Sequence, residues 1–283
     1  MIIRKKEHWF RMLFVWHGSV LPALLPRLGL LLILSLLVTY FHGIILSFKV
    51  PLNPAPLTLF GFVLALFLGF RNNASYDRFW EGRKLWGALL NTSRALTRQA
   101  ITLKNTKGGQ ASVHNFVQLL GAFVYALKLV TASKYKPAVM MRLLAEWVQK
   151  SKDEGSLDSI QQARFDENLD KLSDILGGCE RIISTPIPYS YRVLLHRTVY
   201  IYCFLLPFGL VDSLGWFTPL IVVFVAYTFV AFEAIADEIE EPFGTDANDL
   251  ALNSMCVMID ETIHEMVGEH IAVSPKKAQN IID

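Results

Sequence analysis

The sequence has only three cysteines among its 283 residues, and they lie far apart. Cys179, Cys203 and Cys256 form neither a Cys-x-x-Cys ligand pair nor an even set that could build a disulfide framework. The sequence also lacks a phosphate-binding glycine loop, a nucleophile elbow and a dinucleotide-binding fingerprint. Nothing in it therefore indicates an enzyme or a required cofactor, and we expect reduced thiols in a chain that faces the cytosol.

Strong net charge and a secretory signal are absent as well. The formal net charge is +2, which gives no indication of nucleic-acid binding. The first long apolar run begins near residue 28, too late for an ordinary signal peptide, and no small-residue cleavage site follows it. We therefore expect neither a nucleic-acid partner nor a cleaved secretory leader.

Hydrophobic residues are abundant, at 53% of the chain, and they are concentrated in residues 28–70 and 198–232. Leu28–Phe48 is an uncharged run of about 21 residues, which as a helix is roughly 30 Å long and matches the thickness of a bilayer core. Prolines follow it at positions 51, 54 and 56 and are expected to break the helix. The pattern predicts four membrane spans, at about 28–48, 57–79, 198–214 and 216–236.

Lysine and arginine set the predicted orientation of these spans. Residues 1–27 and 71–104 are rich in both, whereas the turn at 49–56 has only Lys49 and the turn at 211–217 has only Asp212. By the positive-inside rule both termini and the middle region lie in the cytoplasm. We therefore expect a multi-pass protein of the cell inner membrane.

The remaining residues predict cytoplasmic helices at about 80–197 and 246–272. Between residues 160 and 184, apolar residues recur at spacings of three and four, as in a helix that packs against another helix. Phe116–Val130 is apolar too, but it is short and interrupted by polar residues, so we predict a buried soluble helix there. Together the residues predict an all-α membrane protein in which 1–283 form one composite unit.

The second span carries two stripes of different size. Gly61, Ala65 and Gly69 repeat at four-residue spacing, and Phe62, Leu66 and Phe70 repeat one position later. Four residues advance a helix by about 400°, so each set lies nearly on one face. Small residues allow a neighbouring helix to approach closely. If several copies surround an axis, the large residues form stacked apolar rings that can gate ions by dewetting; the alternative is that they face lipid or core.

A polar segment, RNNASYDRFWEGRKLWG, follows this span. Its arginines and aromatic residues fit an anchor at the membrane interface, with side chains that snorkel toward water. The alternative is a polar lining below the apolar rings. The sequence leaves both interpretations open.

Acidic residues cluster after the fourth span, around Pro242-Phe243-Gly244. Carboxylates on such a turn are hard oxygen ligands of the kind that calcium uses, although the spacing is not that of an EF-hand. The alternative is a solvated turn in which Asp246 caps the next helix. His264 and His270 in that helix do not form a His-Glu-x-x-His motif, and we predict that both lie on the surface.

Several segments together resemble the bestrophin family, and a bacterial bestrophin in particular. The matching pieces are Trp16-His17-Gly18-Ser19, Phe67-Leu68-Gly69-Phe70-Arg71-Asn72-Asn73, Arg78-Phe79-Trp80, Gly177-Gly178-Cys179-Glu180-Arg181 and Glu241-Pro242-Phe243-Gly244. The resemblance covers nearly the whole chain. It implies a homopentamer with four transmembrane helices per subunit, a cytoplasmic helical region and one central pore.

The resemblance also assigns residues. It implies that Phe62, Leu66 and Phe70 form the pore neck and that Ile160 forms a cytoplasmic aperture. The family's calcium clasp corresponds to the acidic turn, where Thr245, Ala247 and Asn248 interrupt the acidic run of eukaryotic members. The candidate site for a divalent cation, calcium or zinc, comprises Glu238, Glu241, Asp246 and Asp249.

Three functions follow from these observations. The first is a channel for small monovalent ions; bacterial relatives resemble cation-conducting channels, which favours sodium, and eukaryotic members pass chloride, which is the alternative. The second is a membrane-anchored scaffold or binding module without ion flux. The third, a secondary transporter, is disfavoured because the sequence has no inverted repeat and no charge within a span that could couple ions.

Overall fold

The computed structural model describes Phe10 and residues 15–16, 18–42, 44–45, 48–49, 53–103, 109–129 and 136–269. Nearly all of these residues are helical, as the sequence predicts. The described residues of Lys5–Asp77 and Pro186–Glu240 form one compact unit, here called the apolar unit. Those of Arg78–Thr185 and Glu241–Asp283 form a second, the polar unit. Helix α3 (Pro54–Leu103) contributes residues to both.

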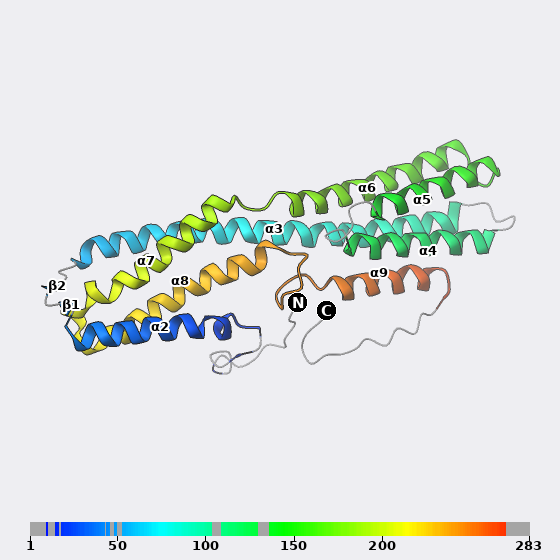
Figure 1. Cartoon of the computed structure of the whole chain (residues 1–283). Coiled ribbons are helices and arrows are strands. Elements are labelled where there is room, and N and C mark those ends of the chain that lie inside the picture. The colour runs from blue at the N-terminus through cyan, green and yellow to red at the C-terminus, as the bar shows by residue number, and fades with distance from the viewer. Residues whose placement is uncertain are drawn as a thin grey trace. The chain divides into compact units, whose positions relative to one another are not determined.

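The apolar unit contains four helical segments. They are α2 (Leu21–Tyr40), the first part of α3, α7 (Tyr189–Leu214) and α8 (Thr218–Glu240). Helices α7 and α8 run antiparallel and are joined by a 3-10 turn at Gly215–Phe217 (Figure 1). Both pack against α2. Among the described residues three stretches are long and apolar enough to cross a membrane: α2, α3 and Tyr189–Glu240, which contains both α7 and α8.

The first two predicted spans have different helix bounds in the structure. Helix α2 begins at Leu21, where Pro22 occupies the first turn, a position that proline tolerates because its missing N–H has no partner there. It ends at Tyr40 rather than near Phe48, and His42 follows with a φ of 48°. A residue in this left-handed conformation reverses the chain after a helix. Beyond it, Ile44–Ile45 and Phe48–Lys49 pair as antiparallel strands β1 and β2.

The later helices are also longer than hydropathy predicts. Helix α3 begins at Pro54 rather than 57, with the Asn53 side chain accepting the Ala55 N–H at 2.9 Å. Helix α7 begins at Tyr189 rather than 198, because Arg192, His196 and Arg197 lower the hydropathy of its first turns without ending the helix. Residues 189–197, which we predicted as a cytoplasmic helix, therefore belong to α7 and to the apolar unit.

Leucine and valine side chains on the facing sides of these helices form the core of the apolar unit. The core includes Leu24, Leu28 and Leu31 of α2, Leu64 and Leu68 of α3, Val199 and Leu206 of α7, and Val222 and Val230 of α8. Because Leu64 and Leu68 are buried here, the opposite face of α3 is left open.

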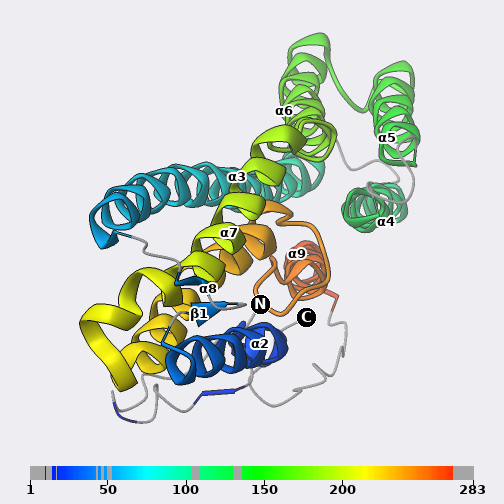
Figure 2. The same cartoon turned by 60° about the vertical axis from the view of Figure 1, so that its left-hand side comes forward.

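The polar unit contains α4 (Gly109–Lys128), α5 (Lys136–Asp153), α6 (Ser159–Ser184) and α9 (Leu252–Met266). Helices α4 and α9 lie side by side and are seen nearly end-on in Figure 2. The predicted stripe on α6 is confirmed: Phe165, Leu169, Leu172, Leu176 and Cys179 are buried in one core. Helix α4 contains the predicted soluble helix, with Phe116, Leu120 and Phe123 fully buried in the same core.

Two predictions about the C-terminal region are wrong. Helix α9 begins at Leu252, and Ala251, not Asp246, occupies its N-cap position without a side-chain cap. His264 is buried, because its ring faces His114 of α4 and its Nδ1 donates to the Asp260 carbonyl, 2.8 Å away. His270 lies outside the described residues.

Candidate functional site

One face of α3 in the apolar unit is apolar and open. Phe62, Leu66 and Phe70 are 69%, 48% and 56% exposed. The face that packs within the chain comprises Gly61, Leu64, Leu68, Arg71 and Ser75. This buried set advances by three and four residues, so it holds the helix in one rotation about its axis. Phe62, Leu66 and Phe70 are therefore not used in packing within their own apolar unit and are accessible to another surface.

The small stripe divides between two environments. Gly61 is buried, and a Cβ built on it would lie 2.5 Å from the Tyr202 hydroxyl of α7. Ala65 and Gly69 are exposed, and nothing lies within 4 Å of a Cβ built on Gly69. Only Gly61 thus serves close packing inside the chain. The role of Ala65 and Gly69 against a neighbouring subunit remains a prediction.

A partly buried ion cluster begins at Arg71, directly after Phe70. The Arg71 side chain is inaccessible and its guanidinium donates to Asp237 and, at 3.4 Å, to Glu240 of α8. Arg192 of α7 lies 3.2 Å from the same Asp237 carboxylate, and Glu240 accepts the Ile187 N–H at 3.3 Å. A buried charge needs such partners, because an unpaired one is too costly to hide from water.

This cluster changes the interpretation of the polar segment after the second span. Arg71 is neither a snorkelling anchor nor a pore lining, because it ties α3 to α8 in the interior of the apolar unit. Asn72 supports the same join, since its side-chain amide donates to the Leu68 and Phe232 carbonyls. The residues next to the large apolar stripe therefore fix its helix in place.

A carboxylate–histidine pair joins α7 to α8. Glu233 is buried, and its carboxylate lies 2.7 Å from Nδ1 of His196. We predicted no charge within a span that could couple ions, and neither Glu233 nor Arg71 was expected as a buried group. For Arg71 a signal was present: it continues the three- and four-residue spacing of Leu64 and Leu68.

Ile160, the predicted aperture residue, lies in the first turn of α6 and is 75% exposed. A capping box starts this helix: the Asp158 carboxylate accepts the Gln161 N–H at 2.7 Å, and the Gln161 side chain accepts the Asp158 N–H at 3.0 Å. Reciprocal bonds of this kind satisfy two N–H groups that the helix leaves unpaired. They hold a large apolar side chain on a rigid helix end, in water-accessible surroundings.

The acidic turn is closed by its own side chain. The Asp249 carboxylate is buried and accepts the Asp246 N–H at 2.7 Å, while the Pro242 carbonyl accepts the Leu250 N–H at 3.1 Å. A Cβ on Gly244 would lie 2.4 Å from the same carboxylate. Among the described residues no three His, Cys, Asp or Glu side chains are placed to hold a metal ion. The divalent-cation site at Glu238, Glu241, Asp246 and Asp249 remains a prediction.

The remaining motif residues pack the polar unit. The Arg78 guanidinium donates to the Ile182 carbonyl at 2.7 Å and to the Thr185 carbonyl, at the end of α6. A Cβ on Gly178 would lie 2.7 Å from Leu85, so the glycine permits α3 and α6 to meet closely. Cys179 is buried in the same contact, and loss of solvation raises the pKa of its thiol to about 12. We therefore infer that the Cys179 thiol is structural and unreactive.

Comparison with known proteins identifies the family. The family model described as bacterial/fungal bestrophin protein matches residues 1–131 and 128–265. A voltage-dependent anion channel-forming protein of Ralstonia nicotianae is 52% identical over 95% of both chains, and YneE of Escherichia coli, which carries the same description, is 39% identical over 95% of both. The crystal structure of a bacterial bestrophin homologue from Klebsiella pneumoniae is 36% identical, with a TM-score of 0.83 over 88% of this chain and all of the other. The chain belongs to the bestrophin family of ion channels, as the sequence motifs predict.

Proposed function

We propose that this chain forms a homopentameric channel in which five α3 helices surround an axial pore for small monovalent ions. The observation that supports this is the open apolar stripe of Phe62, Leu66 and Phe70 beside a face that the chain buries against its own helices. Rings of such residues exclude water from a narrow passage and so can act as a gate. Ala65 and Gly69, exposed next to the stripe, then face the adjacent subunit.

The four helices of the apolar unit cross the inner membrane in this proposal, with both termini in the cytoplasm. Arg71 and Glu233 are buried with partners of opposite charge or with histidine, which is the condition for charged groups at membrane depth. The polar unit then provides the Ile160 aperture on the cytoplasmic side. The scaffold alternative uses the same helices without a conducting axis.

We assign the permeating ions to monovalent cations such as sodium, by resemblance to bacterial members of the family. The neck residues are uncharged and do not distinguish cations from anions. The relatives from Ralstonia and Escherichia are described as forming anion channels, so chloride is the alternative. The reversal potential in a salt gradient decides between them, because its sign follows the more permeable ion.

The test is single-channel recording of the purified protein in planar bilayers. Leu66→Ala, which widens and wets the neck, should raise the conductance roughly twofold or more. Leu220→Ala is the matched control, because Leu220 is an exposed leucine on α8, away from the stripe; it should leave the conductance unchanged. Silent bilayers with wild type and Leu66→Ala, together with a stable partner in pull-downs, would favour the scaffold instead.

A further inference from the structure

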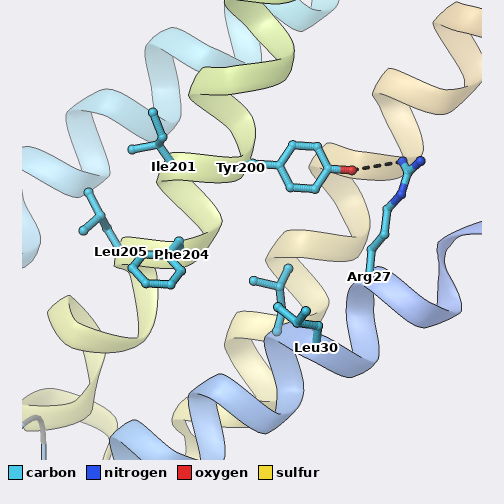
Figure 3. A pocket seen from close by; sticks show the side chains of 7 residues that line it. Arg27, Leu30, Tyr200, Ile201, Phe204 and Leu205 are labelled. Atoms are coloured by element: carbon cyan, nitrogen blue, oxygen red, sulfur yellow. Dashed lines mark hydrogen bonds between the residues drawn. The ribbon is translucent and has the colours of Figure 1, made fainter.

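A groove between α2 and α7 lies outside everything assigned so far. It has a volume of about 460 Å³ and is lined by Arg27 and Leu30 of α2 and by Tyr200, Ile201, Phe204 and Leu205 of α7 (Figure 3). A volume of this size is in the range of sites that hold small molecules, roughly 300–1,000 Å³. Both helices belong to the apolar unit.

The groove is polar at one end only. There Arg27 Nη1 donates to the Tyr200 hydroxyl at 2.9 Å, as Figure 3 shows, and the other lining residues contribute hydrocarbon. Glu233, an acidic residue of the adjoining helix α8, is paired with His196, and the His196 ring lies 4.6 Å from that of Tyr200. Among the described residues, the hydrogen-bond partner of Arg27 is thus a phenol, which carries no charge to balance the guanidinium.

This arrangement matches an amphiphile with an anionic head. Arg27 precedes the uncharged stretch of α2, on the side that the lysine and arginine distribution places in the cytoplasm. A guanidinium held at the head end of an apolar groove is suited to phosphate, because its fork of N–H groups fits two phosphate oxygens at once. The hydrocarbon walls beyond it suit an acyl chain.

We propose that this groove binds an anionic phospholipid of the cytoplasmic leaflet. The phosphodiester lies on Arg27, which Tyr200 positions, and one acyl chain lies along Leu30, Phe204 and Leu205. The head group is bound by charge, so a zwitterionic lipid with the same chains binds less well. The site is independent of the ion path, because none of its residues belongs to the stripe on α3.

Retention of lipid by the intact assembly tests the proposal. The protein is purified in detergent, exposed to phosphatidylglycerol and phosphatidylcholine with identical acyl chains, and analysed by native mass spectrometry. Wild type should retain phosphatidylglycerol about fivefold better, the preference expected for one basic residue at a membrane surface. Arg27→Gln should abolish the preference, Tyr200→Phe should reduce it, and Leu30→Trp, which fills the groove, should lower retention of both lipids.

Arg197→Gln is the matched control, because it removes one charge from an exposed residue of α7 that does not line the groove. It should keep the full preference. Equal losses in Arg27→Gln and Arg197→Gln would overturn the proposal, since the effect would then be general surface charge. Displacement of the bound lipid by inorganic phosphate alone would also overturn the proposal. So would a Leu30→Trp assembly, with the substitution confirmed by its mass, that retains both lipids at the wild-type level. The readout is bound lipid, so failure here leaves the channel proposal intact.

Discussion

At Gly61 the Tyr202 ring occupies the space that any larger side chain would need. The ring itself is confined, because it lies 6.0 Å from the Phe60 ring and 5.4 Å from the Phe229 ring, centroid to centroid. Gly61→Ala should therefore destabilise the protein by about 1–3 kcal/mol through overpacking. The measurement is the midpoint of unfolding of the purified protein in detergent, by heat or denaturant.

Gly29→Ala is the control for this substitution. Gly29 is also inside a helix of the apolar unit, but nothing lies within 4 Å of a Cβ built there. Alanine at such a position is neutral or stabilising, by up to about 1 kcal/mol, because it restricts the unfolded chain and favours helix. If both variants melted at the same temperature, close packing of Gly61 against Tyr202 would be wrong.

The residues that the sequence failed to assign are those whose partners lie far along the chain. For Arg71 the sequence left open a membrane-surface anchor, because charge beside an apolar run normally snorkels toward water, and a polar pore lining. Its carboxylate partners on α8 are 166 and 169 positions away, and no local pattern reports such a separation. The stripe of Phe62, Leu66 and Phe70, by contrast, depends only on helical spacing, and its shared exposed face was predictable.

The end of α6 is held by a side chain from α3. Arg78 bonds two carbonyls there at once, from the two terminal nitrogens of one planar guanidinium, and lysine cannot reproduce this geometry because all its donors are on a single nitrogen. Arg78→Lys should increase amide exchange in the last turn of α6, around Arg181–Ser184, and leave the first turn, with its own capping box, unchanged. Hydrogen–deuterium exchange with peptide-level mass spectrometry measures this.

Arg94→Lys is the comparison for that experiment, since Arg94 is an exposed arginine on the same helix. It should exchange like wild type throughout α6. Unchanged protection in Arg78→Lys would mean that the two carbonyl bonds do not stabilise the helix end. In that case the Arg78-Phe79-Trp80 motif would have another role.

The presence of these helices was predictable from the sequence, whereas the residues at which they begin and end were less predictable. Hydropathy located the apolar stretches because burial and membrane insertion both select apolar residues. It shortened α7 because polar residues in the first turns, such as Arg192 and His196, bond within the fold instead of ending the helix. It extended the first span past Tyr40 because Ile44, Ile45 and Phe48 are as apolar in a strand as in a helix.

At the scale of the whole molecule, the sequence motifs identified the family. Resemblance to that family is the source of the proposals about the assembly, which a single chain does not show. The number of subunits and the pore axis are properties of an assembly, so they stay proposals. The acidic turn shows a different limit of prediction from the sequence. Its composition predicts a divalent-cation site, which stays a prediction, and the fold adds a bond from the turn's own backbone to Asp249, which composition does not reveal.

The proposed neck and aperture act in series if they lie on one ion path, and this makes their effects interdependent. Resistances in series add. If the neck has the larger resistance, a change in the resistance of the aperture has little effect on the total conductance. We therefore expect Ile160→Ala to change single-channel conductance little in wild type and clearly more in the Leu66→Ala background. Because Ile160 is exposed, its truncation should cost little stability, within about 0.5 kcal/mol.

Met258→Ala, at an exposed apolar residue of α9, serves as the control in both backgrounds and should have no effect in either. A double variant, Leu66→Ala with Ile160→Ala, that conducts like Leu66→Ala alone would remove Ile160 from the path. The neck would remain the single constriction, and the capping box at Asp158 would then serve only to start α6. The two residues belong to different units of the chain, and a non-additive effect of the two substitutions is what a shared path predicts.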